Sequence, residues 1–208
     1  MANKIIQWNC RSIKANFEEM NLLVSNGKPV AICLQETFLK DTDKFSFKYH
    51  SCYLKNLEGI EKASGGVGII VNNGVPHRTI PLNTTLQAVA VSVSVNKTIT
   101  LCSIYLPPSS PISRKKLDDL VEQLPKPYIL MGDFNSHHTL WGCSHTDNKG
   151  RIIEDFISNH DLVLLNDKSS TYHHPATGSY SSLDLTICTP DIFPAFSWKV
   201  DSDLIFLQ

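Results

Sequence analysis

The sequence carries almost no excess of charge, and it lacks any long apolar run. Its 208 residues include 19 lysines and arginines against 20 aspartates and glutamates, a formal net charge of -1. This balance excludes a general positive field that would attract nucleic acid, so any contact with DNA must use local groups such as Arg114, Lys115 and Lys116. The N-terminal stretch MANKIIQWNC has no apolar segment of the length that a signal peptide or membrane anchor needs, and we expect neither.

The cysteines form no closely spaced pair. A structural zinc site usually needs pairs of the CxxC kind, whereas the six cysteines stand at positions 10, 33, 52, 102, 143 and 188. Most of them lie inside apolar runs, which is the usual setting of a buried free thiol. We therefore expect reduced cysteines and an intracellular protein.

Short apolar runs rich in β-branched residues recur along the chain and predict strands. One of them, LQAVAVSVSV, alternates apolar and small residues, which favours a half-buried antiparallel strand, and the VNKT at its end suits a hairpin turn. The other strand-like runs are KIIQWNC, PVAICLQET, GVGIIVNN, TITLCSIYLP, PYILMGDF, LVLLN and LDLTICT.

Three segments have helical patterns. Residues 16–25 carry apolar residues at helical spacing, residues 113–124 begin with a serine cap and stop before a proline, and residues 150–159 are amphipathic. There is no internal repeat and no linker. We therefore predict a single α/β domain over residues 1–208.

Polar residues of catalytic type follow several predicted strands. Each one alone could be a cap or a turn former. As a set they are more informative, because a sheet delivers its strand ends to a shared rim, where the active sites of layered folds lie. The residues are Asn9, Glu36, Tyr105, Asp133 with Asn135, and Asp184.

This set suits phosphodiester hydrolysis. Glu36 is a hard ligand for Mg²⁺, which would polarise the phosphate. Asp133 can hold or deprotonate the attacking water. Asn9, Asn135 and Tyr105 are neutral donors for the pentavalent phosphate.

Along the chain, W-N near the N-terminus is followed by L-Q-E-T, Y-x-P-P, G-D-F-N and S-x-D-L-T. In type and order, these motifs resemble the exonuclease–endonuclease–phosphatase superfamily. The finer resemblance is to the endonuclease domains of non-LTR (LINE-type) retrotransposons, especially the jockey-like group. It runs over almost the whole chain, and the ordered set is more specific than any single motif. The motifs are QWNCRSI, LQETFL, GGVGIIV, IYLPPS, MGDFNSHHTLWG, a helix that begins with GR, and SSLDLT.

The resemblance implies a four-layer sandwich, in which two mainly antiparallel β-sheets pack face to face between outer helices. It implies a Mg²⁺-dependent endonuclease, with Mn²⁺ as an alternative metal, that nicks DNA and leaves a 3′-hydroxyl to prime reverse transcription. The partners would be DNA and, in a longer polyprotein, the element RNA and a reverse transcriptase domain. The protein would act in the nucleus, although no targeting signal is visible, and no membrane is implied.

Site roles also carry over by position. Glu36 matches the metal ligand, and Asn9 is its neighbour. Tyr105 would contact phosphate. Asp133 would activate water, and Asn135 would orient it and stabilise the transition state.

Asp184 would orient a catalytic histidine, which the superfamily supplies in a Ser-Asp-His motif near the C-terminus. The chain ends SWKVDSDLIFLQ, and residues 198–204 match the strand that leads to this motif. The motif would then fall at or just past Gln208. In a second alignment Ser202-Asp203 are part of it, and Leu204 replaces the histidine.

Both alignments predict a domain that lacks its final motif and strand. A frameshift, a splice change, a domain cut from a longer polyprotein and a decayed copy all remain open as origins. Whether Asp203 replaces a metal ligand is also open.

Two further residues are candidate DNA contacts. Arg11 stands where repair endonucleases have a carboxylate and retroelement relatives have arginine; it suits a phosphate contact, and a plain surface arginine is the alternative. His137 and His138 are adjacent, so on an extended segment they point to opposite sides and at most one faces the site. We choose His137, against the alternative of a polar loop, and the spacing of the histidines enforces no zinc site.

Two other functions stay open. The chain could be a catalytically impaired copy that at most binds DNA, because the histidine motif is missing. It could also be another member of the superfamily, such as a lipid phosphatase or an RNA deadenylase. Arg11 and the HH-x-x-WG loop favour the retroelement endonuclease over this last group.

Overall fold

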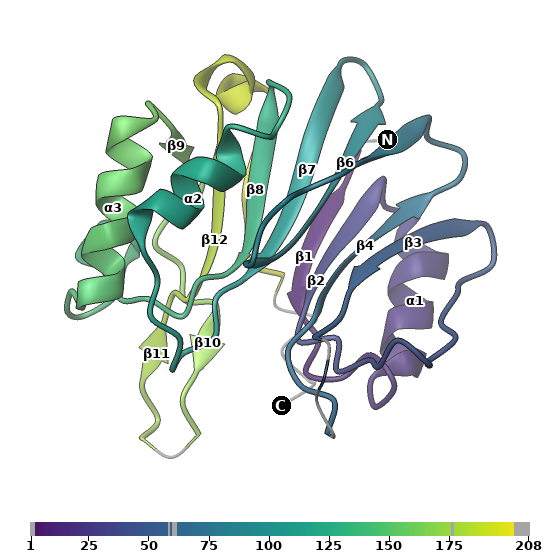
Figure 1. Cartoon of the computed structure of the whole chain (residues 1–208), viewed down its shortest axis with the longest axis horizontal. Coiled ribbons are helices and arrows are strands. Elements are labelled where there is room, and N and C mark those ends of the chain that lie inside the picture. The colour runs from purple at the N-terminus through teal and green to yellow at the C-terminus, as the bar shows by residue number, and fades with distance from the viewer. Residues whose placement is uncertain (1–2, 58, 60–61, 176, 202–208) are drawn as a thin grey trace.

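Two β-sheets pack face to face, and helices cover their outer faces, in the computed structural model (Figure 1). The structure describes residues 3–57, 59, 62–175 and 177–201. The predicted motif region at Ser202-Asp203 and Leu204 lies outside these residues.

The smaller sheet has four strands, and it holds the first half of the site. β1 and β2 are parallel, and the other neighbours are antiparallel. The order is β1 (Ile5–Asn9), β2 (Ala31–Gln35), β4 (Val67–Asn72) and β3 (His50–Lys55).

The larger sheet has six strands, and β7 and β8 are its only parallel pair among the described strands. A separate two-stranded hairpin consists of β10 (Tyr172–His173) and β11 (Tyr180–Ser181). The order in the large sheet is β5 (His77–Ile80), β6 (Gln87–Ser94), β7 (Thr98–Tyr105), β8 (Tyr128–Asp133), β12 (Asp184–Cys188) and β9 (Val163–Leu164).

Helix α1 covers the small sheet, and α2 and α3 cover the large one (Figure 1). The four layers therefore enclose three apolar cores, one between the sheets and one under each set of helices. This arrangement confirms the predicted α/β four-layer sandwich. The helices are α1 (Phe17–Gly27), α2 (Arg114–Val121) and α3 (Asn148–Asn159), with short 3₁₀ helices at Thr139–Trp141 and Pro190–Ala195.

The sequence prediction for strand β6 was wrong in one respect. The strand and its hairpin turn to β7 are present, but the strand is buried on both faces instead of half-buried. Ala88 and Ala90 pack in the core under α2 and α3, while Val91 and Val93 pack between the sheets. The intervening Ser92 is small enough to be buried as well.

The other predicted elements are present, with shifted ends. Helix α2 stops at Val121, short of the predicted residue 124, and α3 begins at Asn148, ahead of the predicted Gly150. The early start of α3 follows from its cap, because the Asp147 carboxylate accepts a hydrogen bond from the Gly150 amide at 2.6 Å. Strands β3, β5, β10 and β11 were not predicted.

All six cysteines are free thiols, and all except Cys52 are buried. Burial raises the pKa of Cys33 to about 12, so this thiol stays protonated and unreactive. None of the described helices has the length and apolar character needed to cross a membrane.

Gly132 provides the first testable prediction, because it sets the spacing between β7 and β8. A Cβ at this position would overlap the carbonyl group of Ile104, with its carbon at 2.8 Å. Backbone atoms cannot move aside cheaply, so we expect Gly132→Ala to lower the free energy of unfolding by about 3 kcal/mol. Urea unfolding measures this change.

Gly27→Ala is the matched control, because a Cβ there would meet only Pro29 Cδ at an ordinary 3.7 Å. Its effect should stay within about 1 kcal/mol. Equal losses in the two variants would contradict the close approach of the strands.

Candidate active site

The strand ends named above meet at one rim of the sandwich. Parallel pairing places Asn9 beside Gln35 and Tyr105 beside Asp133, since parallel strands end at the same edge. Asp184 begins β12 directly opposite Asp133 in the antiparallel pair. The structure therefore brings the predicted catalytic residues together.

Buried hydrogen bonds hold the two sheets in this alignment. The Gln35 side-chain amide donates to the Ser103 hydroxyl at 3.0 Å, and that hydroxyl donates to the Leu34 carbonyl at 2.9 Å. Gln35 and Ser103 are both fully buried. Because an unpaired buried polar group is costly, these bonds oppose any sliding of one sheet over the other.

The amide of Asn9 joins two carboxylates from different sheets. Its Nδ2 lies 2.8 Å from Glu36 Oε1 and 2.8 Å from Asp133 Oδ2. Glu36 follows strand β2 of the small sheet, and Asp133 ends β8 of the large sheet. The two carboxylates therefore lie close to each other and share one amide donor, and a cation nearby would offset their repulsion.

Three predicted site residues have a left-handed backbone conformation, which residues other than glycine rarely adopt. The φ angles are 40° at Arg11, 52° at Glu36 and 45° at Asn135. Such conformations cost about 1–3 kcal/mol each and are found preferentially at functional sites. Here they turn the chain sharply at the strand ends, where the polar side chains project.

Asn135 has an unsatisfied donor. Its backbone amide donates to Asp133 Oδ1 at 2.9 Å. Its side-chain Nδ2 is buried and has no hydrogen-bond partner among the described residues. A buried donor left unpaired costs about 1–3 kcal/mol, which an acceptor on a ligand would recover.

Two carboxyl groups at the rim, those of Asp133 and Asp184, have raised pKa values. Burial raises the pKa of Asp133, and the nearby charge of Asp184 raises it further. Burial also raises the pKa of Asp184, with a smaller contribution from Glu36, while Arg11 acts in the opposite direction. Burial and the charges of Glu36 and Asp133 raise the pKa of Tyr105, so this hydroxyl keeps its proton and can donate it in a hydrogen bond.

Comparison with known proteins identifies the family. The model of the family described as "Endonuclease-reverse transcriptase" matches residues 99–205, just over half of the chain. The chain belongs to this family.

Two curated relatives come from transposable elements of flies. The chain is 26% identical to the probable RNA-directed DNA polymerase from transposon BS of Drosophila melanogaster, over 96% of this chain and 23% of that protein. It is 22% identical to the RNA-directed DNA polymerase from mobile element jockey of Drosophila funebris, over 88% of this chain and 20% of that protein. The chain thus spans less than a quarter of the length of these relatives.

Solved structures share the fold. The endonuclease domain of TRAS1, a telomere-specific non-LTR retrotransposon, has a TM-score of 0.80 at 24% identity and covers 98% of this chain and 93% of its own. The 3′-5′ exonuclease NExo from Neisseria meningitidis has a TM-score of 0.75 at 16% identity and covers 98% and 94%. The resemblance to a retrotransposon endonuclease domain of the exonuclease–endonuclease–phosphatase superfamily is confirmed.

Within this endonuclease fold, Asp184 has an unexpected partner. Gln7 Nε2 donates to Asp184 Oδ1 at 3.1 Å, and a hydrogen bond from the Thr171 side chain also lowers the pKa of this carboxyl. In the part of the chain that the structure describes, no histidine hydrogen bond to Asp184 is recorded. Sequence reasoning missed Gln7, although one polar residue inside the apolar run KIIQW was a visible signal.

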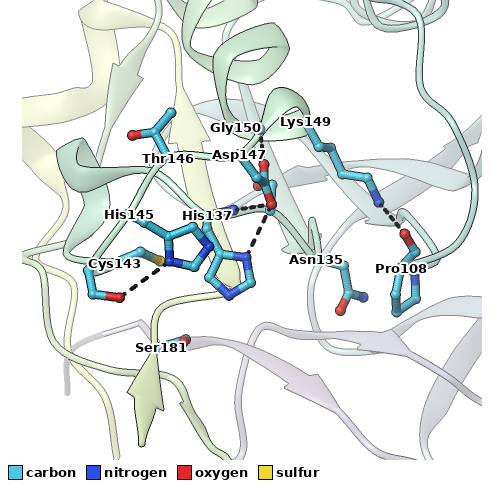
Figure 2. A network of polar contacts seen from close by, with 12 residues as sticks. Pro108, Asn135, His137, Cys143, His145, Thr146, Asp147, Lys149, Gly150 and Ser181 are labelled. Atoms are coloured by element: carbon cyan, nitrogen blue, oxygen red, sulfur yellow. Dashed lines mark hydrogen bonds and ion pairs between the residues drawn. The ribbon is translucent and has the colours of Figure 1, made fainter.

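The two adjacent histidines point to different neighbours, as predicted. The His137 ring stacks on His145 with 4.7 Å between centroids, and His138 lies against Trp141 at 4.9 Å. Figure 2 shows His137 held by Asp147, whose carboxylate lies 3.2 Å from His137 Nδ1. Trp141 is fully buried and anchors the loop through a 3.2 Å bond from its Nε1 to the Ser136 carbonyl.

Arg11 lies beside the β10–β11 hairpin. Its guanidinium carbon is 5.2 Å from the ring centroid of Tyr172, a cation–π geometry that orders an otherwise exposed side chain. In this position the Arg11 guanidinium can bind an anion that approaches Asp184. The predicted contact residues Arg11 and His137 thus come from separate loops.

The residues at this rim fit a single divalent cation with few protein ligands. Among the described residues, no three His, Cys, Asp or Glu side chains gather closely enough to form a complete metal cage. Mg²⁺ does not need one, because it keeps several waters and binds through one or two carboxylates and substrate phosphate. Glu36 and the Asn9 oxygen are donors of the hard kind that it prefers.

The raised pKa of Asp133 predicts an effect of pH on stability. The unfolded chain loses this proton near the usual Asp pKa, whereas the folded domain keeps it to higher pH, so the folded domain loses stability as pH rises through that interval. Asp133→Asn removes the loss. We expect the Tm of Asp133→Asn minus that of wild type to increase between about pH 5 and about pH 8. Thermal unfolding of both proteins in EDTA measures this difference.

Asp155→Asn, on the exposed face of α3, is the control and should shift Tm little at any pH. If the difference between Asp133→Asn and wild type did not change with pH, the pKa of Asp133 would not be raised.

Proposed function

We propose that residues 1–208 form one endonuclease domain that hydrolyses a phosphodiester bond of DNA with Mg²⁺ and leaves a 3′-hydroxyl. The observation that carries the proposal is the Asn9 amide, which joins Glu36 and Asp133 across the two sheets at one rim. The nick would prime reverse transcription in a LINE-type element. The fly relatives, which are named as RNA-directed DNA polymerases, support this context.

Glu36 and Asn9 would hold the metal. When bound, Mg²⁺, or Mn²⁺ in its place, supplies a Lewis acid that polarises a phosphate oxygen and offsets negative charge. Asn9 can serve two purposes at once, because its Nδ2 donates to the carboxylates while its Oδ1 remains an acceptor. The Arg11 backbone amide donates weakly to that oxygen at 3.3 Å.

Asp133 and Asn135 would act on the attacking water. Once ionised, the Asp133 carboxylate is a stronger base than an exposed one, because burial raises its pKa. The unpaired Asn135 Nδ2 would donate to a phosphate oxygen as charge develops there. Tyr105 keeps its hydroxyl proton and would donate it in a second hydrogen bond to the phosphate.

Asp184 would orient a catalytic histidine supplied by a Ser-Asp-His motif in a longer form of the protein. In the described part of the chain its carboxylate is bound by Gln7. Because no histidine donates to Asp184 among the described residues, a second candidate function is a copy with impaired catalysis that retains DNA binding. A histidine acid or base is worth factors of about 10² to 10⁴ in rate, so the two candidates differ measurably.

Arg11 and His137 would contact the DNA backbone. A Neisseria phosphatase with the same fold is described as bound to a product DNA hairpin, which supports DNA as the partner. Element RNA and a reverse transcriptase domain would be partners within a longer polyprotein. Action on chromosomal DNA would take place in the nucleus.

The direct test is nicking of supercoiled plasmid. We expect conversion to open circles with Mg²⁺ and none with EDTA, and the nicked ends should prime a DNA polymerase without prior phosphatase treatment. Asp133→Ala should reduce the rate by about 10² or more, because the water loses its base. Asp155→Ala is the control on the exposed surface.

Equal rates for wild type and Asp133→Ala would support the impaired copy. A Mg²⁺-dependent reaction whose ends required phosphatase treatment before priming would contradict the proposed product.

Metal binding can be tested without activity. Mg²⁺ binds the folded domain and should raise Tm, by an amount that corresponds to about 2.7 kcal/mol at a hundredfold excess over Kd. Glu36→Gln keeps the size of the side chain but removes the charged ligand, so most of the rise should be lost. Scanning fluorimetry with and without Mg²⁺ measures it, and Glu154→Gln on α3 is the control. A rise of the same size in Glu36→Gln would exclude Glu36 as a ligand.

A further inference from the structure

The proposed site has an electrostatic difficulty. Glu36, Asp133 and Asp184 place three carboxyl groups at one rim, in a chain of net charge -1. DNA brings a phosphate polyanion to the same place, so binding requires cations close by. Arg11 is one of them, and Lys149 is a second that the sequence motifs did not indicate.

Lys149 lies in the first turn of α3, and it reaches across to the loop that follows Tyr105. Its Nζ donates to the Pro107 carbonyl at 2.8 Å and to the Pro108 carbonyl at 3.3 Å. Figure 2 shows the Lys149 side chain extended toward Pro108. The ammonium group is thus held on the loop that begins just after Tyr105, close enough to Asp133 for that charge to act on its pKa.

The start of α3 is itself fixed to the catalytic loop. Asp147 accepts hydrogen bonds from the backbone amides of His137 and Gly150, at 3.1 Å and 2.6 Å. Gly150 packs so closely on the His137 carbonyl that a Cβ would overlap it. The backbone of Lys149, two residues after Asp147, is therefore fixed in place. Because Asp147 and Gly150 both contact His137, it is fixed relative to the Asp133–Asn135 segment that precedes His137.

Holding the loop at Pro107 and Pro108 uses only part of what the Lys149 ammonium group offers. An ammonium has three N–H groups, and the two proline carbonyls take two of them. The side chain is only partly buried, and although burial lowers the pKa of Lys149, the charges of Asp147 and Asp133 act to raise it. A lysine fixed in this way has already lost rotamer freedom worth up to about 2 kcal/mol, so it can bind an anion without that penalty.

We propose that Lys149 binds a backbone phosphate of the DNA next to the Tyr105–Asn135 side of the site. The inference rests on the proposed action on DNA, and it adds a phosphate contact that is separate from Arg11. The contact is not specific for base sequence, since it reads only the phosphate. It would help to set the register of the duplex over Asp133.

The experiment is a salt titration of DNA binding in EDTA, where no cleavage interferes. Binding of a fluorescent duplex is followed by anisotropy for wild type and Lys149→Gln, which keeps an N–H donor for the proline carbonyls but has no charge. One lost phosphate contact should reduce the slope of log K against log salt by about 0.9, and affinity by about eightfold at 0.1 M salt. The change should be the same for duplexes of different sequence.

Lys97→Met is the matched control. Lys97 precedes β7, whose other end carries Tyr105, and it is paired with Asp191 at 2.8 Å. It should leave the slope unchanged. Lys149→Arg, which retains the charge, should keep the wild-type slope, and thermal unfolding of each variant shows whether it is folded.

If folded Lys149→Gln bound DNA more weakly but with an unchanged slope, Lys149 would only hold the loop at Pro107 and Pro108. That result would overturn the inference. An unchanged affinity, or a wild-type chain that does not bind DNA, would also overturn it. Failure of the nicking assay with salt-dependent binding intact would contradict the proposed function and leave the Lys149 contact standing.

Discussion

The alignment of the two sheets depends on a few buried hydrogen bonds between them. Apolar burial has no preferred direction, whereas the bonds of Gln35 with Ser103, and of Ser103 with the Leu34 carbonyl, require one geometry. Gln35 lies one residue before Glu36, and Ser103 lies two residues before Tyr105. The contact between Asn9, Glu36 and Asp133 exists only in this alignment, so the proposed chemistry depends on a structural constraint outside the site.

The site is costly to build, and the fold compensates for it elsewhere. Left-handed backbone at Glu36 and Asn135, an unpaired amide on Asn135 and a buried carboxyl at Asp133 all oppose folding. Three apolar cores supply the opposing free energy. A domain whose strand ends were relaxed and fully paired would be more stable, but it would have no donors left for a phosphate group.

Apolar runs predicted most of the strands because they are local signals, whereas the four layers were implied only by the family resemblance. Strands β3 (HSCYLK) and β5 (HRTI) were missed since neither is a clear apolar or alternating run. Asn9, Glu36 and Asp133 were predicted as one site because each follows a predicted strand and strand ends share a rim, and the family resemblance then added their roles. Gln7 and Lys149 were not predicted, because their partners Asp184 and Pro107 lie far away in the sequence, and no local pattern marks such a pair.

The Asp184 carboxylate is held in place by residues other than the histidine that it would orient. A carboxylate has about four lone-pair positions, and the recorded bonds from Gln7 and Thr171 leave capacity for another donor. Gln7 is itself held by the Thr186 hydroxyl, to which Trp198 Nε1 donates at 3.2 Å. Trp198 belongs to the segment that resembles the approach to the Ser-Asp-His motif. The same segment that would deliver a histidine therefore also stabilises the carboxylate that would receive it, through Thr186 and Gln7.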